Sequence, residues 1–342
     1  MTNTKTARIG VIGAGGIANS VHLPSLKELP TAELVAICDL RPEKAEAAAR
    51  KFGTAHTTTY WDMYAMLDKE HLDGVLVLVE PDRLFRVARD VMMHGLPVLM
   101  EKPAGISAHQ ANSLVRVSQE QGVVCAVAMN RRHVPLVQQV MKRMQEVTTL
   151  TQVDGMFYKN SDIQRSWDYA SAYGTDGIHA LDLVRYLAQG EVVDCSSVIG
   201  RYSGSAVDNA WASVMRFDNG VIGTMRSNYQ TGARVHTFGM HGPGASAYIN
   251  LGFGGTECDA VILYNKGGAM YSLASGGVGG LDRETYDGRD IAGSDAFHAY
   301  YGYKAEDEDF INAILTGGQP MCTVADAARS MELAEKLLAS AI

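Results

Sequence analysis

The sequence predicts an α/β protein of two domains. Residues 1–128 form a doubly wound parallel sheet, and residues 129–342 form an α+β domain with a large, mostly antiparallel open sheet. Two observations carry this prediction: apolar runs alternate with helical segments up to about residue 128, and short alternating strands with glycine-rich turns follow. A chain of 342 residues is also longer than one hydrophobic core usually supports.

Five continuous apolar, β-branched runs predict the strands of the first domain, because strands buried on both faces of a parallel sheet have this composition. They are Ile9–Ile12, Leu34–Cys38, Val75–Val79, Val98–Met100 and Val123–Ala128. Helical segments lie between them, among them Pro42–Lys51 and Leu84–His94. A doubly wound sheet binds its ligand beyond the carboxyl ends of its strands, so the residues that follow these runs are candidates for a site.

The second domain is predicted to begin with a helix over Val134–Val147. Strands follow at Trp211–Phe217, Val221–Tyr229 and Val235–Met240, with Asp218-Asn219-Gly220 as a hairpin turn between the first two. A last helix from Val324 has the capping pattern of Thr323 and Asp326 ahead of an apolar face. Periodicity assigns no element between about Gly252 and Tyr303.

Composition and charge exclude several functional classes. The chain is 46% hydrophobic and 20% charged, as in soluble globular proteins, and its net charge of −8 disfavours nucleic acid or an anionic membrane as partner. The five cysteines form no Cys-x-x-Cys pair, so neither a disulfide framework nor a metal site is predicted. No uninterrupted apolar stretch approaches about 18 residues, the length that a transmembrane helix needs, so no membrane-spanning segment is expected. With no signal-peptide cleavage pattern at the N-terminus, we expect a cytoplasmic protein.

The first apolar run ends in Gly13-Ala14-Gly15-Gly16-Ile17-Ala18, which predicts a dinucleotide-binding turn. Gly13 permits a sharp turn, Gly15 lets a phosphate approach the backbone, and the next helix offers free amides to it. Asp39 ends the second run, where a carboxylate accepts a hydrogen bond from the adenosine ribose and repels a 2′-phosphate. NAD is therefore the expected cofactor, while Arg41 keeps NADP as the alternative. A glycine turn that only links strand to helix is the structural alternative.

Two residues are candidates for acid–base chemistry. Lys102 follows Val98–Met100 at the edge where the cofactor would lie, and a partly desolvated lysine beside a cationic nicotinamide would release its proton more readily. His179 lies on a predicted helix three residues before Asp182, which can fix the tautomer of its ring. The alternatives are a salt bridge of Lys102 with Glu101 and a surface pair of His179 with Asp182.

With these motifs, the chain resembles the glucose–fructose oxidoreductase, inositol dehydrogenase and MocA family (Gfo/Idh/MocA) along nearly its whole length. The matching segments are Gly13–Ala18, Glu101-Lys102-Pro103, Asn130–Pro135, the helix with His179 and Asp182, and the last helix with Gly317–Pro320 ahead of it. The resemblance implies a Rossmann domain and a second domain whose open sheet builds a homodimer or homotetramer. It also implies hydride transfer between nicotinamide and a secondary alcohol or ketone of a sugar, inositol or related polyol.

In that family a lysine and a histidine that correspond to Lys102 and His179 form the acid–base site. The aspartate that usually lies four residues before the histidine is Thr175 here, and the acid is Asp176, one residue later. We therefore take Asp176 as the third catalytic candidate. The family's Thr-Pro-Asn-x-x-His pattern is replaced by Glu80–Phe85, which adds charge where the nicotinamide ribose is expected.

The expected function is an NAD-dependent dehydrogenase of a sugar, inositol or similar polyol, in which His179 or Lys102 takes the hydroxyl proton and the other hydrogen-bonds the reacting oxygen. The alternatives are a sugar hydrolase or eliminase that uses NAD without net redox change, and a non-enzymatic regulator that binds cofactor and sugar. Cofactor contacts are expected from Gly13, Gly15, Gly16, Ile17, Asp39, Arg41, Pro81, Glu101 and Lys102. Substrate contacts are expected from Lys102, Asn130, Arg131, Trp167, Thr175, Asp176 and His179.

Overall fold

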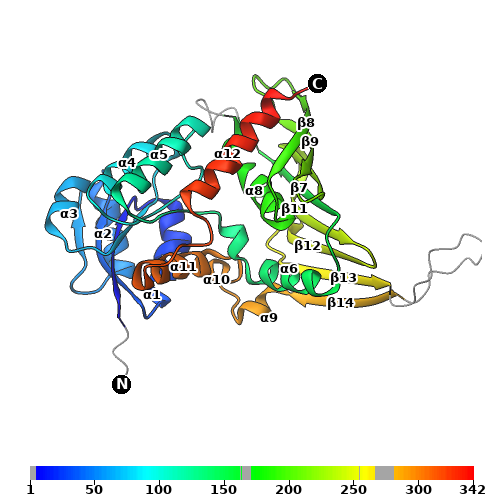
Figure 1. Cartoon of the computed structure of the whole chain (residues 1–342). Coiled ribbons are helices and arrows are strands. Elements are labelled where there is room, and N and C mark those ends of the chain that lie inside the picture. The colour runs from blue at the N-terminus through cyan, green and yellow to red at the C-terminus, as the bar shows by residue number, and fades with distance from the viewer. Residues whose placement is uncertain (1–4, 162, 164–170, 254, 266–280) are drawn as a thin grey trace, which may run out of the picture. The chain divides into compact units, whose positions relative to one another are not determined.

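The computed structural model describes residues 5–161, 163, 171–253, 255–265 and 281–342, which divide into two compact units (Figure 1). Unit 1 comprises Met1–His133 and Ala296–Glu332, and unit 2 comprises Val134–Asp295 and Leu333–Ile342. The division after His133 lies close to the predicted boundary. Residues 296–332, which we expected in the second domain, belong to unit 1.

Unit 1 is built on a six-stranded parallel sheet with the strand order β3-β2-β1-β4-β5-β6. The strands are β1 (Ala7–Ile12), β2 (Ala32–Cys38), β3 (Thr58–Tyr60), β4 (Gly74–Val77), β5 (Val98–Met100) and β6 (Cys125–Val127). All five predicted runs form strands, and β3 is an addition at the sheet edge. The strand order reverses between β1 and β4, which is the switch point at which such sheets bind ligands.

The helical elements of unit 1 follow the strands in the expected alternation. They are η1 (Ala18–His22, a π-helical turn), α1 (Leu23–Glu28), α2 (Pro42–Phe52), α3 (Met63–Lys69), α4 (Pro81–Met93), α5 (Ala108–Gln121), η2 (Asn130–His133, a 3-10 turn), α10 (Phe297–Tyr300), α11 (Tyr303–Thr316) and the first part of α12 (Val324–Ala339). Helix α11 lies beside α1 (Figure 1). Its Phe310 and Ile311 join Ile9 and Val11 in the core, which explains why this late segment belongs to unit 1.

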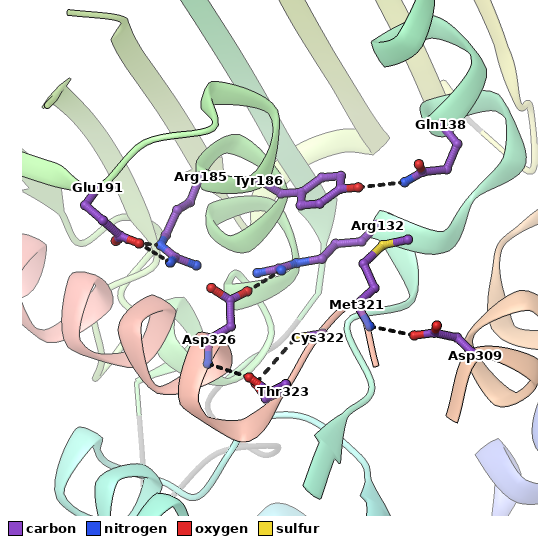
Figure 2. Close-up of polar contacts among 10 residues, drawn as sticks. All are labelled: Arg132, Gln138, Arg185, Tyr186, Glu191, Asp309, Met321, Cys322, Thr323 and Asp326. Carbon is purple, nitrogen blue, oxygen red and sulfur yellow. Dashed lines mark hydrogen bonds and ion pairs between the residues drawn. The ribbon is translucent and has the colours of Figure 1, made fainter. Parts of the chain in front are cut away.

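The start of α12 is fixed by polar contacts within unit 1 (Figure 2). Thr323 Oγ1 accepts a hydrogen bond from the backbone of Asp326 at 3.2 Å, which confirms the predicted cap. The carboxylate of Asp326 binds the guanidinium of Arg132, whose side chain is 3% exposed. Just before the helix, Asp309 accepts a hydrogen bond from the backbone of Met321 at 2.7 Å. The acid of the predicted capping pattern therefore also neutralises a buried arginine.

Unit 2 contains an eight-stranded sheet with the order β14-β13-β12-β11-β7-β10-β9-β8, in which β7 and β10 are parallel and the other neighbours antiparallel. The strands are β7 (Gln152–Asn160), β8 (Val192–Gly200), β9 (Ala210–Phe217), β10 (Ile222–Asn228), β11 (Gln230–Gly242), β12 (Ala245–Phe253), β13 (Asp259–Asn265) and β14 (Leu281–Asp287). The predicted hairpin turn joins β9 to β10, with Gly220 at φ 87°.

Helices α6 (Pro135–Val147) and α8 (Ile178–Ala188) pack on one face of this sheet (Figure 1). Helix α8 approaches β7 so closely that a Cβ at Gly155 would lie 2.6 Å from a methyl group of Val184. The shorter helices α7 (Ala172–Thr175) and α9 (Gly288–Ala292) and the end of α12 complete unit 2. The region in which periodicity assigned no element thus contains β13, β14, α9 and α10.

In the part of the chain that the structure describes, no helix is long and apolar enough to cross a membrane. The same residues contain no group of three or more histidine, cysteine or acidic side chains arranged to hold a metal ion.

Candidate active site

A pocket of about 640 Å³ lies in unit 1, beyond the carboxyl ends of β1, β2 and β4. Four of the predicted cofactor residues line it: Gly13, Gly15, Asp39 and Arg41. Residues that the sequence analysis did not select line it as well, namely Lys44, Trp61, Tyr64, Arg83 and Arg86. Trp61 is 68% exposed and follows β3, a strand that no hydrophobic pattern marks, so no pattern in the sequence identified it.

The glycine turn has the conformation that a phosphate-binding site requires. Gly13 adopts φ +100° and donates its N–H to the carbonyl of Cys38 at 2.8 Å. Asn19 Nδ2 donates to the carbonyls of Ala14 and Gly15, both at 2.9 Å. A Cβ built on Gly15 or Gly16 meets no atom within 4 Å, so the backbone there is open to a ligand. The residues present therefore fit a dinucleotide pyrophosphate.

The carboxylate of Asp39 fastens the end of β2 to the glycine turn. Its Oδ2 accepts the N–H of Ala14 at 2.8 Å, and its Oδ1 accepts the N–H of Arg41 at 2.9 Å. Each carboxylate oxygen has two lone pairs, so one remains on each to accept a hydrogen bond from a ribose hydroxyl. Asp39 thus holds the turn in place while it faces the pocket.

Lys102 follows β5, which is the neighbour of β4 in the same sheet, and its side chain is partly exposed. Its backbone N–H donates to Oε2 of Glu101 at 3.0 Å. Oε1 of Glu101 lies 3.3 Å from Nε2 of His22, and the Glu101 side chain is 12% exposed. The carboxylate that we expected near the cofactor is therefore engaged within unit 1. Pro81 is the buried first residue of α4.

Asn130 and Arg131 lie in η2 and are 1% and 4% exposed. Asn130 Nδ2 donates to the carbonyl of Tyr301 at 2.9 Å, which ties η2 to the segment between α10 and α11. This contact gives Asn130 a structural role within unit 1. Contact of either residue with substrate stays a prediction.

In unit 2 the acid at the shifted position is held by two partners that the sequence analysis did not select. Lys159 Nζ lies 2.7 Å and 2.9 Å from the two carboxylate oxygens of Asp176, and the hydroxyl of Tyr229 donates to Oδ2 at 2.9 Å. Lys159 also lies 4.7 Å above the ring of Phe157. A lysine on the side of β7 that alternation predicts to be buried is a signal that could have identified Lys159.

Thr175, which occupies the family's usual acid position, is 1% exposed and donates its hydroxyl to the carbonyl of Ser171 at 2.9 Å. This hydrogen bond spans the short helix α7 and stabilises it. His179 lies in the first turn of α8 and is partly exposed, while Asp182, three residues on, is 1% exposed. Trp167 lies outside the described residues.

Comparison with known proteins matches two segments of the chain to family models. Residues 7–129 match the family model of the oxidoreductase family with an NAD-binding Rossmann fold, and residues 141–248 match that of the GFO/IDH/MocA C-terminal domain. The chain belongs to the Gfo/Idh/MocA oxidoreductase family. The resemblance read from the sequence and the expected fold class are thereby confirmed.

Several relatives of this Gfo/Idh/MocA protein are dehydrogenases by name. It is 28% identical over 242 residues to 4-carboxy-2-hydroxymuconate-6-semialdehyde dehydrogenase of a Sphingobium species, an alignment that covers 68% of this chain and 75% of that enzyme. It is 26% identical over 253 residues to myo-inositol 2-dehydrogenase of Thermotoga maritima, which covers 69% and 73%. Among solved structures, a dehydrogenase from Chromobacterium violaceum shares the fold with a TM-score of 0.86 at 19% identity, covering 98% and 96%.

Proposed function

We propose that this protein is an NAD-dependent dehydrogenase that transfers hydride between nicotinamide and a secondary alcohol or ketone of a sugar, inositol or related polyol. The observation that carries the proposal lies within unit 1. The glycine turn, Asp39 and Lys102 follow β1, β2 and β5 of one parallel sheet, and the carboxyl ends of parallel strands meet at one edge. Relatives that include a myo-inositol 2-dehydrogenase favour a polyol substrate.

The chain's own residues bind the cofactor and move the proton. The dinucleotide, when bound, supplies the hydride acceptor. Backbone amides of the Gly13–Ala18 turn bind the pyrophosphate, and Asp39 accepts a hydrogen bond from the adenosine ribose. Of the two acid–base candidates, Lys102 or His179 accepts the proton of the substrate hydroxyl as hydride leaves the same carbon for the nicotinamide.

Asp39 supports NAD rather than NADP as the preferred cofactor. Its carboxylate is fixed by two backbone amides, so it cannot readily turn away from a 2′-phosphate that it would repel. Arg41, Lys44 and Arg83 also line the pocket and provide positive charge nearby. We therefore propose a preference for NAD with measurable use of NADP.

The proposal is tested with a panel of sugars, inositols and sugar acids, each offered with NAD and with NADP, while the reduced cofactor is followed by absorbance. We expect net formation of NADH with one class of these compounds, and a higher kcat/KM with NAD than with NADP. Sugar cleavage without net NADH would assign the chain to the hydrolase alternative. Binding of cofactor and sugar without any turnover would assign it to the regulatory alternative.

We also propose that the open face of the unit 2 sheet binds a second copy of this chain. Val198, Val214 and Ile222 lie on neighbouring strands of this face, opposite the helices, and are 54–55% exposed. A cluster of large apolar side chains exposed on a sheet is typical of an interface. We expect a dimer or tetramer by sedimentation analysis and a smaller species for Val214→Arg. A native chain that sediments as a monomer at micromolar concentration would refute this.

A further inference from the structure

A cluster of buried and half-buried titratable side chains in unit 1 includes Glu101, the residue before Lys102. We call it the His22 cluster, and it consists of His22 from η1, Glu101 from the loop after β5, and Tyr303, Glu306 and Asp307 from α11. The side chains of His22 and Asp307 are 0% exposed, and Nδ1 of the ring lies 2.8 Å from Oδ1 of Asp307. Nε2 of the same ring lies 3.3 Å from Oε1 of Glu101. The mechanism proposed above uses none of these contacts.

Glu101 connects this cluster to the backbone of Lys102. One carboxylate oxygen faces His22 and the other accepts the Lys102 N–H at 3.0 Å, so both oxygens are engaged at once. Because both of its oxygens are bonded, the Glu101 side chain is held in one rotamer. That rotamer in turn restricts the orientation of the peptide group whose N–H it accepts, which is the peptide of Lys102. The Lys102 side chain extends from that peptide. Its direction therefore depends on the contact between His22 and Glu101.

Charge strengthens the contact. Burial alone would lower the pKa of His22, but the charges and hydrogen bonds of Asp307 and Glu101 raise it well above its usual value. Burial would raise the pKa of Glu101, but His22 and then Lys102 lower it. The surroundings therefore favour the imidazolium form of His22 and the carboxylate form of Glu101, and such charge-assisted hydrogen bonds are about twice as strong as neutral ones.

The other titratable groups around His22 come from α11. Burial raises the pKa of Glu306 well above its usual value and also raises that of Asp307. Burial thus disfavours the charged form of Glu306. The ring of Tyr303 meets the imidazole edge-on at 5.8 Å, and burial raises its pKa, so it stays protonated. From outside the cluster, the charge of Arg131 lowers the pKa of Tyr303 slightly, and the charge of Asp309 raises the pKa of Glu306.

We propose that His22 is a positioning residue for Lys102: its ring holds the carboxylate of Glu101, which holds the backbone of the lysine in the orientation needed for proton transfer. The proposal rests on the dehydrogenase function proposed above. It goes beyond that function because it assigns a role to a residue that contacts neither cofactor nor substrate.

Two substitutions at His22 distinguish a role in positioning Lys102 from a role in which the ring only fills space in the core. In His22→Gln the side-chain amide nitrogen lies about where Nε2 of the imidazole was, so it can still donate to Glu101. In His22→Asn the amide nitrogen lies about where Nδ1 was, so it donates to Asp307 and loses the contact with Glu101. We expect His22→Asn to lower kcat by about 10²-fold, as a misplacement of about 1 Å at a reacting group does, with the affinity for NADH unchanged. His22→Gln should recover most of kcat. The reverse order would mean that His22 serves only Asp307, and the proposal would fall.

Hydrogen exchange at the Lys102 amide tests the proposal without turnover. Its N–H bonds to Glu101, so its exchange should accelerate in His22→Asn and stay near the native rate in His22→Gln. Unchanged exchange in a folded His22→Asn chain would overturn the inference. If the native chain oxidised no polyol, the proposed function would fail while this measurement still decided the role of His22.

Should neither His22 variant fold, Glu101→Gln provides the same test by replacing one carboxylate oxygen with an NH2 group. Its amide group cannot form an ion pair with the imidazolium. We expect faster exchange at the Lys102 amide and a lower kcat. Native exchange and native kcat in Glu101→Gln would refute the proposal.

Discussion

Replacement of Lys102 by alanine is expected to lower kcat by about 10²- to 10⁴-fold, the contribution of a positioned general acid or base, while the affinity for NADH stays near that of the native chain. The substitution removes the amine that follows β5. The glycine turn and Asp39, which bind the dinucleotide, follow β1 and β2 and keep their contacts with each other. Steady-state kinetics and titration of NADH fluorescence measure the two quantities separately.

Lys69→Ala is the matched control, because Lys69 is an exposed lysine at the end of α3 in the same unit. We expect native kinetics from it. If Lys102→Ala retained a kcat within a few-fold of the native value, proton transfer would have to be assigned to His179. Loss of NADH affinity together with kcat would instead show that Lys102 binds the cofactor.

The strands of unit 1 could be predicted because each is a continuous apolar run, and burial on both faces of a parallel sheet requires such runs. Strand β2, for example, contains the whole predicted run Leu34–Cys38. Strand β3 was missed for the opposite reason. Its residues Thr58–Tyr60 are exposed or half-buried at the sheet edge, so no hydrophobic pattern marks them.

That α11 belongs to unit 1 could not be predicted from the hydrophobic pattern of its own sequence. His22 and Asp307 are 285 residues apart in the chain, and only the packing of α11 beside α1 brings them together. Burial of a carboxylate depends on that packing as well. Sequence spacing predicts partners within one helix or across one turn, and it carries no information on pairs of this separation.

Asp176 shows the same limit within unit 2. The sequence identified the shift of the acid from Thr175 to Asp176 relative to the family pattern. It did not reveal that Lys159 and Tyr229 hold this acid. These two partners come together because β7 pairs with β10 in parallel, and long-range strand pairing is not determined by the periodicity of either strand. A catalytic role for Asp176 therefore stays a prediction.

The second large effect is expected from alanine substitutions in the glycine turn, which should separate folding from cofactor binding. Gly13 adopts φ +100°, and a Cβ there would overlap the carbonyl of Leu78. The backbone of Leu78 cannot easily yield, because its N–H is bonded to Ile12 at 2.8 Å. We expect Gly13→Ala to lower the free energy of unfolding by about 2–4 kcal/mol, from backbone strain and overpacking together.

Gly15→Ala should leave stability unchanged and weaken cofactor binding, in contrast to Gly13→Ala. A Cβ at Gly15 meets no atom within 4 Å and the residue has an ordinary φ, so the thermal unfolding temperature should match that of the native chain. The methyl group would occupy the space through which a phosphate approaches the backbone. We expect the affinity for NADH to fall by about 10- to 100-fold, which corresponds to one lost hydrogen bond to a charged group. Native affinity in Gly15→Ala would mean that the dinucleotide binds elsewhere, and unfolding of this variant would mean that the turn is more crowded than its geometry indicates.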